Sequence, residues 1–205
     1  MTWNQTSPSG VELNKAAKSG ASAVDQAQQP ADLAQTWATQ ILAHQTAIFR
    51  LAYLMVGDTL IAEDLAQETV MRALRMQHQF DSERPLKPWL LQITANLARN
   101  YRRSLRRYLR ALQRFALQQP VHSEFNETSG PAWEATQLWQ AIGRLAQREQ
   151  EVIYLRYFLE LSEQETAQAL GIAQGTVKSR LHRALVRLRG VVDGEFPELR
   201  TERCA

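Results

Sequence analysis

The chain has 205 residues, of which 44% are hydrophobic and 22% charged, and its formal net charge is +3. These values are ordinary for a soluble globular protein and exclude a collagen-like, wholly disordered or disulfide-rich chain, and the single cysteine, Cys204, excludes an internal disulfide. Because no apolar run approaches the roughly 20 residues that span a bilayer, and no signal peptide is recognisable, we expect a cytoplasmic protein without membrane insertion.

The N-terminal half of the chain is predicted to contain a tail and one helical domain. Residues 1–30 are rich in Ser, Ala, Gln and Gly and are predicted to be a disordered tail. Apolar residues recur at helical spacing over Leu33–Met55, and a second helix with a narrow buried stripe is predicted over Leu60–Gln77. A third helix is predicted over Pro88–Leu112. Residues 31–115 are therefore predicted to form one domain.

The second predicted helix has an acidic face. Asp64, Gln67, Glu68 and Met71 recur at three- and four-residue steps, and no Lys or Arg precedes Arg72 in this helix. A face that combines carboxylate, amide and thioether groups suits a protein partner better than DNA. Acidic residues near a helix start also favour the helix dipole, which explains Glu63 but explains Gln67 and Glu68 less well.

The third predicted helix lies in a strongly basic tract. Nine basic residues and no acidic one occur between residues 84 and 123. A stripe of arginines lies beside an apolar face that is predicted to continue as far as Leu105 and Tyr108. Asn and Arg side chains can contact base edges and phosphates, and aromatic rings at the start of the helix can stack on an unpaired base, although Trp89 could equally be core. The candidate nucleic-acid contacts are Phe80, Trp89, Asn96, Arg99, Asn100 and Arg103.

A second helical domain follows a change in composition. Residues 116–131 contain Pro, Asn, Ser and Gly and are predicted to be a flexible linker, residues 132–192 a second domain, and residues 193–205 a C-terminal tail. No segment alternates with a period of two, so no sheet is predicted. The predicted fold class is all-α, with two small helical domains joined by the linker.

The segment Leu161–Arg189 has the features of a helix-turn-helix motif. Ser162 and Glu165 have capping-box spacing, and Gly171 permits a tight turn between two helices. The second helix is predicted to bury Val177, Leu181, Ala184, Leu185 and Leu188. Its opposite face is polar and basic, as in helices that enter the major groove of DNA. The candidate contacts on that face are Thr176, Lys178, Ser179, His182 and Arg183.

Three segments, Gly57–Arg75, Phe80–Arg107 and Leu145–Arg189, resemble bacterial RNA polymerase sigma factors. The resemblance is to the small extracytoplasmic-function (ECF) class, which keeps only conserved regions 2 and 4. It implies a sigma factor that directs core RNA polymerase to specific promoters and assists promoter opening, with core polymerase, promoter DNA and an anti-sigma factor as partners. One departure is Ala146-Gln147, where the family usually has Pro-Glu.

The resemblance also implies a role for each candidate contact. Asp64, Gln67 and Glu68 match the family's polymerase-binding motif. Asn96, Arg99, Asn100 and Arg103 match the helix that recognises the −10 element, and Phe80 and Trp89 match the part that captures an unstacked base. The five candidates from Thr176 to Arg183 match the −35 recognition helix.

Other classes of function fit the sequence less well. The four histidines have no metal-ligand spacing, and no phosphate-binding loop or nucleophile elbow is present, so we expect no catalysis, cofactor or metal. The main alternative is a homodimeric helix-turn-helix regulator that acts without polymerase docking, but it leaves the first basic tract unused. An RNA-binding or scaffolding protein leaves the helix-turn-helix features unexplained.

Overall fold

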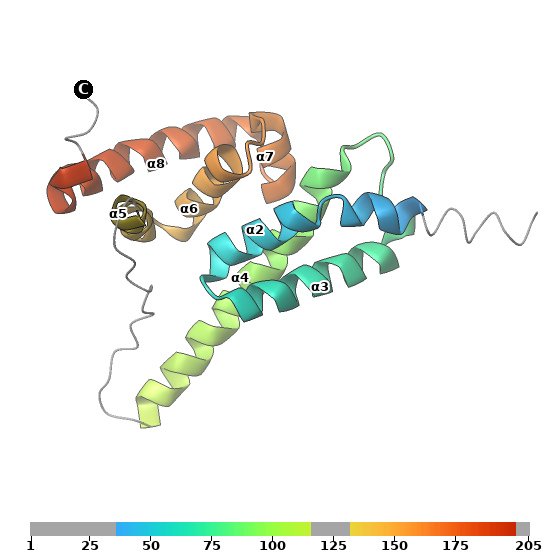
Figure 1. Ribbon diagram of the computed structural model, residues 1–205, viewed down its shortest axis with the longest axis horizontal. Helices are drawn as coiled ribbons and strands as arrows, with labels where there is room; N and C mark the ends of the chain where they lie inside the picture. Colours follow the sequence, from blue (N-terminus) through green and yellow to red (C-terminus); the bar gives the residue numbers. More distant parts are fainter. Residues whose placement is uncertain (1–35, 116–131, 200–205) are drawn as a thin grey trace, which may run out of the picture.

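The computed structural model describes residues 36–115 and 132–199, and its regular elements in those ranges are all helical (Figure 1). A short helical segment, residues 36–42, precedes α2 (Gln45–Val56), α3 (Thr59–Arg75), the 3₁₀ turn η1 (Gln77–Gln79) and α4 (Leu86–Phe115). The second part contains α5 (Ala132–Gly143), α6 (Gln147–Ile153), the π-helical turn η2 (Tyr154–Phe158), α7 (Glu163–Leu170) and α8 (Gln174–Glu195).

The predicted all-α class is confirmed, as is the helix-turn-helix, which is formed by α7 and α8. The predicted tail, residues 1–30, and the predicted linker, residues 116–131, lie outside the described residues. None of the described helices has the length and apolarity needed to cross a membrane.

Local signals set the junction between α2 and α3. Gly57 adopts a left-handed conformation with φ 75°, and its N–H donates to the Tyr53 carbonyl at 2.8 Å. The Asp58 side chain then caps α3 by accepting from the Ile61 N–H at 2.9 Å. The predicted first helix, Leu33–Met55, is interrupted, because the chain turns at residues 43–44 before α2 begins.

One hydrophobic cluster holds the first domain together. The stripe predicted on the second helix is confirmed, since Ala62, Ala66, Thr69 and Ala73 of α3 are buried. Their small side chains let α3 pack closely against α2 and α4. The buried members of this cluster are Trp37, Ile41, Ile48, Ala66, Ala73, Leu90, Ile93 and Leu97.

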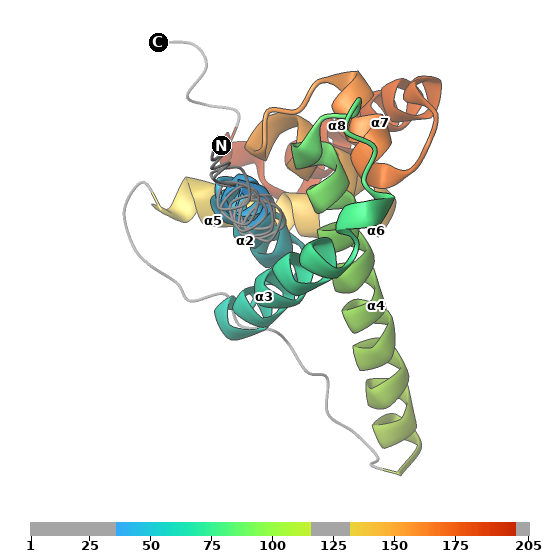
Figure 2. The same cartoon turned by 90° about the vertical axis from the view of Figure 1, so that its right-hand side faces the viewer.

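A second hydrophobic cluster joins the two domains. Leu51 of α2 and Leu91 and Ala95 of α4 belong to the same buried cluster as Leu155 and Val177 of the second domain. In Figure 1 and Figure 2, the start of α4 lies beside α7. The sequence predicts two separate cores, whereas this packing gives the domains a shared one.

The last turns of α4 extend past the helices that pack against its start, as Figure 2 shows. Leu105 is therefore 41% exposed and Tyr108 62% exposed, although the predicted apolar face of this helix includes both. The predicted burial of Leu185 on α8 is wrong, because only Val177 and Ala184 are fully buried on that helix. On α4 the apolar spacing continues beyond the point where its packing partners end. On α8, Leu188 still packs against the core beyond Leu185, so Leu185 lies at the edge of the buried face.

The turn of the helix-turn-helix depends on Gly171. Its φ is 65°, and its N–H caps α7 by donating to the Ala167 and Gln168 carbonyls. A Cβ at this position would lie 3.1 Å from Nε2 of Gln92 on α4. We expect Gly171→Ala to lower the free energy of unfolding by about 1–2 kcal/mol, measured by urea denaturation.

The matched control for this change is Gly175→Ala near the start of α8. A Cβ there meets no atom within 4 Å, and its φ is not left-handed. Because alanine favours helix over glycine by about 1 kcal/mol, Gly175→Ala should leave stability unchanged or raise it. Equal losses at both glycines would show that the turn conformation at Gly171 is not what matters.

Candidate functional site

The acidic face of α3 is exposed and partly organised by ion pairs. Asp64 and Gln67 are exposed, and Asp64 forms no ion pair within 4 Å among the described residues. Glu68 accepts from Arg72 at 2.6 Å and lies 3.8 Å from Arg75. The hydrogen bond from Arg72 lowers the pKa of the Glu68 carboxyl. The predicted trio thus lies on one helix face and is negatively charged.

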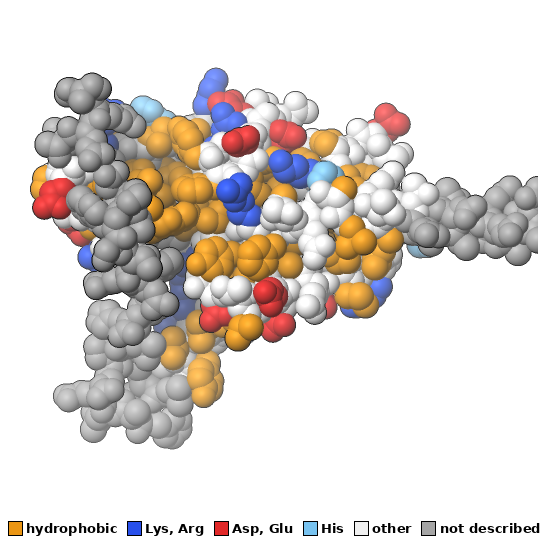
Figure 3. Space-filling model, viewed as in Figure 1, with side chains coloured by type: hydrophobic (Ala, Val, Ile, Leu, Met, Phe, Trp, Pro, Cys, Tyr) orange, Lys and Arg blue, Asp and Glu red, His pale blue; other side chains and the backbone are white. Residues whose placement is uncertain are grey.

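An apolar groove runs beside the acidic face. It has a volume of about 670 Å³ and lies between α3 and the α2 side of the domain, with Phe49, Val70 and Gln67 among its lining residues. Leu42 and Met71, which also line it, are each 51% exposed. Figure 3 shows hydrophobic side chains over the face formed by α2 and α3, with acidic side chains along its edge. This combination of an apolar groove and carboxylates suits a protein partner.

The predicted aromatic contacts lie in a cluster of three rings. The ring centroids of Phe80 and Trp89 are 5.0 Å apart, and Trp37 lies 5.2 Å from Phe80 and 6.1 Å from Trp89. Phe80 and Trp89 are both half-buried against the core of the first domain. Each ring therefore packs on one side and keeps part of its surface accessible, which is what base stacking requires.

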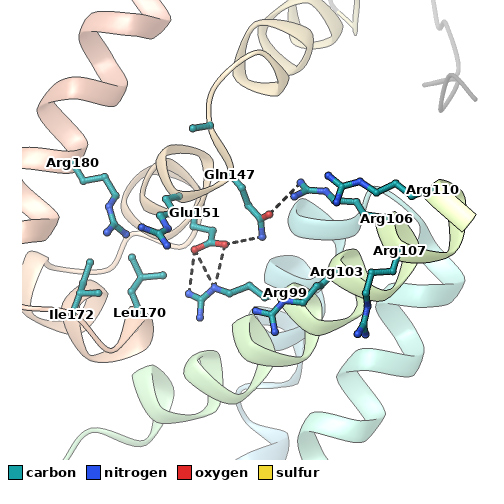
Figure 4. Close-up of a pocket in the computed structure, with 12 residues that line it drawn as sticks. Arg99, Arg103, Arg106, Arg107, Arg110, Gln147, Glu151, Leu170, Ile172 and Arg180 are labelled. Carbon is teal, nitrogen blue, oxygen red and sulfur yellow. Dashed lines mark hydrogen bonds and ion pairs between the residues drawn. The ribbon is translucent and has the colours of Figure 1, made fainter. Parts of the chain in front are cut away.

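The polar residues of α4 lie on one side of the helix, where Arg99 makes a contact that links the two domains. Its Nη2 lies 3.1 Å and its Nε 3.2 Å from the carboxylate of Glu151 on α6, and its Nη1 donates to the Asn96 side chain at 2.8 Å (Figure 4). The Glu151 side chain is 4% exposed and that of Arg99 25% exposed. Asn100 and Arg103 are exposed and form no ion pair among the described residues.

The candidate contacts on α8 face away from its buried side. Lys178, Ser179, His182 and Arg183 are exposed and Thr176 is half-buried, whereas Val177 and Ala184 are buried. Arg183 Nε donates to the Ser179 carbonyl at 3.2 Å, which holds the guanidinium along the helix. The capping box that starts α7 is confirmed: the Ser162 hydroxyl accepts from the Glu165 N–H at 3.1 Å, and the Glu165 carboxylate accepts from the Ser162 N–H at 2.8 Å.

Comparison with known proteins identifies both domains. Residues 40–108 match the family model for Sigma-70 region 2, and residues 135–188 match that for Sigma-70 region 4. The chain is 33% identical to the ECF RNA polymerase sigma factor SigL of Mycobacterium tuberculosis over 147 residues. The matched segment covers 71% of this chain and 82% of SigL. The chain belongs to the ECF RNA polymerase sigma factors.

Other relatives agree with this assignment. The RNA polymerase sigma-E factor of Streptomyces coelicolor is 30% identical over 149 residues, 73% of this sigma factor and 81% of that protein. Among solved structures, the sigma factor RpoE in complex with the anti-sigma factor NepR from Bartonella quintana has a TM-score of 0.62 at 25% identity, over 78% of this chain and 99% of that one. CnrH in complex with the cytosolic domain of CnrY, at 22% identity and a TM-score of 0.59, shares the fold.

The structure of this sigma factor brings some of the predicted residues together across the domains. Trp89 of the region 2 domain lines the same hollow of about 440 Å³ as Gly171 and Gln174 of the helix-turn-helix. Arg50 of α2 and Lys87 of α4 donate to the carbonyls of Phe158 and Leu159 at the end of η2. The acidic face of α3 takes no part in these domain contacts.

Sequence reasoning missed the carboxylates of α6. Glu149 accepts from Arg187 of α8 at 2.7 Å and from the Ala146 N–H at 3.2 Å, and Glu151 pairs with Arg99, 52 positions earlier in the chain. Both carboxylates are buried in the folded chain. Neither pair leaves a periodic or spacing signal, because Glu149 meets Arg187 from another helix of its own domain and Glu151 meets Arg99 from the other domain. Within the described residues, no group of three or more His, Cys, Asp or Glu side chains is placed to hold a metal ion.

Proposed function

We propose that this sigma factor directs core RNA polymerase to promoters and assists promoter opening through three separate surfaces. The observation that supports this most strongly is the division of charge within segments that match regions 2 and 4. One exposed acidic helix face lies on α3, and two basic helices, α4 and α8, lie on different domains. A polymerase contact and two DNA contacts account for all three surfaces.

The acidic face of α3 is the polymerase contact in this proposal. Asp64 supplies an exposed carboxylate, Gln67 an amide, and Glu68 a carboxylate that Arg72 holds in place. The adjoining groove at Met71 adds apolar area, which charged side chains alone do not provide. A basic partner surface with an apolar ridge would match this combination.

The exposed polar face of α8 is the contact for the −35 element. Thr176, Ser179 and His182 can approach base edges in the major groove, and Lys178 and Arg183 can reach bases or phosphates. The buried side of α8 packs on the rest of the domain through Val177 and Ala184 and fixes the orientation of this face.

We expect Arg183→Ala to weaken promoter binding by the holoenzyme by about 1–3 kcal/mol, because a bidentate contact to a base is worth that much. Footprinting measures the effect on a promoter fragment that run-off transcription has first identified. The control, Arg189→Ala, removes the same charge from the same helix farther along and should have a smaller effect. Unchanged occupancy with Arg183→Ala would remove this residue from the proposed contact.

The α4 helix and its aromatic cluster form the contact for the −10 element. Asn96, Asn100 and Arg103 provide polar groups, and the half-buried rings of Phe80 and Trp89 provide stacking surface for an unstacked base. Unstacking a base costs a few kcal/mol, which stacking and arginine–phosphate contacts would offset. Because Glu151 engages two nitrogens of Arg99, this residue reaches DNA only after that ion pair opens.

The remaining expectations follow from the same proposal. A promoter-binding protein works where the chromosome is, so we place this sigma factor in the cytoplasm. It acts by binding, without catalysis of its own and without a cofactor. Since the similar RpoE structure contains an anti-sigma factor, we infer that a protein of that class regulates this chain.

Two affinities separate the sigma-factor proposal from a homodimeric regulator. The proposal expects tight binding of the full chain to core RNA polymerase and weak binding of the free chain to DNA, both measurable by fluorescence anisotropy. A homodimeric regulator would instead bind palindromic DNA strongly and with steep salt dependence in the absence of polymerase. That second pattern, with no affinity for core polymerase, would refute the proposal.

A further inference from the structure

A cleft lined by arginines separates α4 from α6 and α8. All arginines of α4 from Arg99 to Arg110 except Arg102 lie on one wall, and Arg148 of α6 and Arg180 of α8 lie on the other. Figure 4 shows the five α4 arginines on one side of this space and Arg180 with Leu170 and Ile172 across from them. The cleft volume is about 810 Å³, within the usual range for small-molecule sites.

The charge of the cleft is almost uncompensated. Glu151 is its only acidic lining residue, and both oxygens of that carboxylate already accept hydrogen bonds from Arg99. Among the described residues, no carboxylate lies within 4 Å of the guanidinium of Arg103, Arg148 or Arg180. Like charges focused between low-dielectric walls attract anions strongly.

The surroundings of Arg180 disfavour its positive charge. Burial and the neighbouring guanidinium of Arg148 lower the pKa of Arg180. Such a lowering means that the charged form of Arg180 lacks full compensation from solvent and from Glu151. A bound anion would supply that compensation.

The shape and chemistry of the walls select the kind of anion. Guanidinium groups form bidentate hydrogen bonds to phosphate oxygens, and here they come from three helices rather than from one exposed face. A compact anion with several phosphates can contact both walls at once, whereas a single phosphate cannot neutralise so many arginines. We propose that this cleft binds a small polyphosphate, either free or carried by a nucleotide, and that the bound anion bridges the two domains.

An apolar patch at one end of the cleft distinguishes the two sources of polyphosphate. Leu170 and Ile172 lie beside Arg180 and away from the projecting end of α4 (Figure 4). A nucleoside base could pack on this patch while its phosphates contact the arginines. The bare anion would leave the patch uncovered. An anion held here also occupies Arg103, which the proposed function assigns to DNA.

Isothermal titration calorimetry of the full chain with sodium tripolyphosphate tests the proposal. We expect saturable binding at one site per chain at a fixed ionic strength. Arg103→Gln with Arg148→Gln removes one exposed cation from each wall and should weaken the affinity at least tenfold. The control, Arg75→Gln with Arg189→Gln, removes the same charge from exposed positions outside the cleft and should change the affinity by less than about twofold.

Two further measurements make the outcome decisive. Without ligand, the Tm of the cleft variant should be no lower than that of the wild type, because the variant removes like charges, and tripolyphosphate should raise the Tm of the wild type more than sulfate does at equal ionic strength. Tighter binding of ATP or GTP than of tripolyphosphate would assign the site to nucleotides, and equal binding would assign it to the bare anion. Absence of saturable binding, or equal losses in the cleft and control variants, would overturn the proposal and would leave the proposed sigma-factor function intact.

Discussion

Reversing the charge of the α3 face, with Asp64→Lys and Glu68→Lys together, should reduce the affinity for core RNA polymerase by about a hundredfold or more. Two carboxylates that complement a basic partner surface become two cations that repel it, and like-charge contacts at an interface cost several kcal/mol. The fold should survive, because Asp64 is exposed and the ion pairs of Glu68 within residues 36–115 and 132–199 are with Arg72 and Arg75 on its own helix.

The matched control for this change lies in the loop before α4. Asp81→Lys with Glu83→Lys alters the net charge by the same amount, and both side chains are exposed at positions outside α3. The exposed ion pair between Asp81 and Arg84, which this control removes, contributes little to stability. Binding measured without DNA should therefore stay near the wild-type value for the control. Wild-type affinity of the Asp64→Lys, Glu68→Lys variant would refute the assignment of this face.

Breaking the Arg99–Glu151 ion pair should destabilise the chain by about 2–4 kcal/mol for either single change, Arg99→Met or Glu151→Leu. Removing one partner of a buried pair leaves the other charge without compensation, and the partial exposure of Arg99 places the effect below that of a fully buried pair. The double variant, which replaces both charges by apolar groups, should be more stable than either single variant. Urea denaturation of the full chain measures all three.

An exposed ion pair provides the comparison for this cycle. This pair joins Arg144, whose side chain is 63% exposed, to Glu195, whose side chain is 49% exposed. Its N···O distance of 3.1 Å equals that between Arg99 and Glu151. Arg144→Met and Glu195→Leu should each change the free energy of unfolding by about 0.5 kcal/mol or less. Additive losses for Arg99 and Glu151, with no recovery in the double variant, would contradict a coupled role for the pair.

Features of the fold that depend on neighbouring residues could be predicted from the sequence. The capping box at Ser162 and Glu165, the turn at Gly171 and the buried stripe of α3 all formed as expected. Each depends on interactions within four residues or on helical periodicity, and both leave a pattern in the chain. The exposed positions of Asp64, Gln67 and the polar face of α8 followed from the same periodicity.

Features that depend on how the domains meet could not be predicted. Glu151 lies beside Arg99 only because the two domains pack together, and 52 positions separate the two residues along the chain. The exposure of Leu105 and Tyr108 reflects where the partners of α4 end, which helical spacing does not encode. The interruption at residues 43–44 lacks a Gly or Pro that would have indicated it.

Run-off transcription with purified core RNA polymerase on a pool of genomic fragments tests the central claim most directly. We expect the full chain to give discrete transcripts from particular fragments, with none from core polymerase alone, and the Asp64→Lys, Glu68→Lys variant to give none. If the folded wild-type chain gave no specific transcript from any fragment, the claim that it selects promoters would be contradicted.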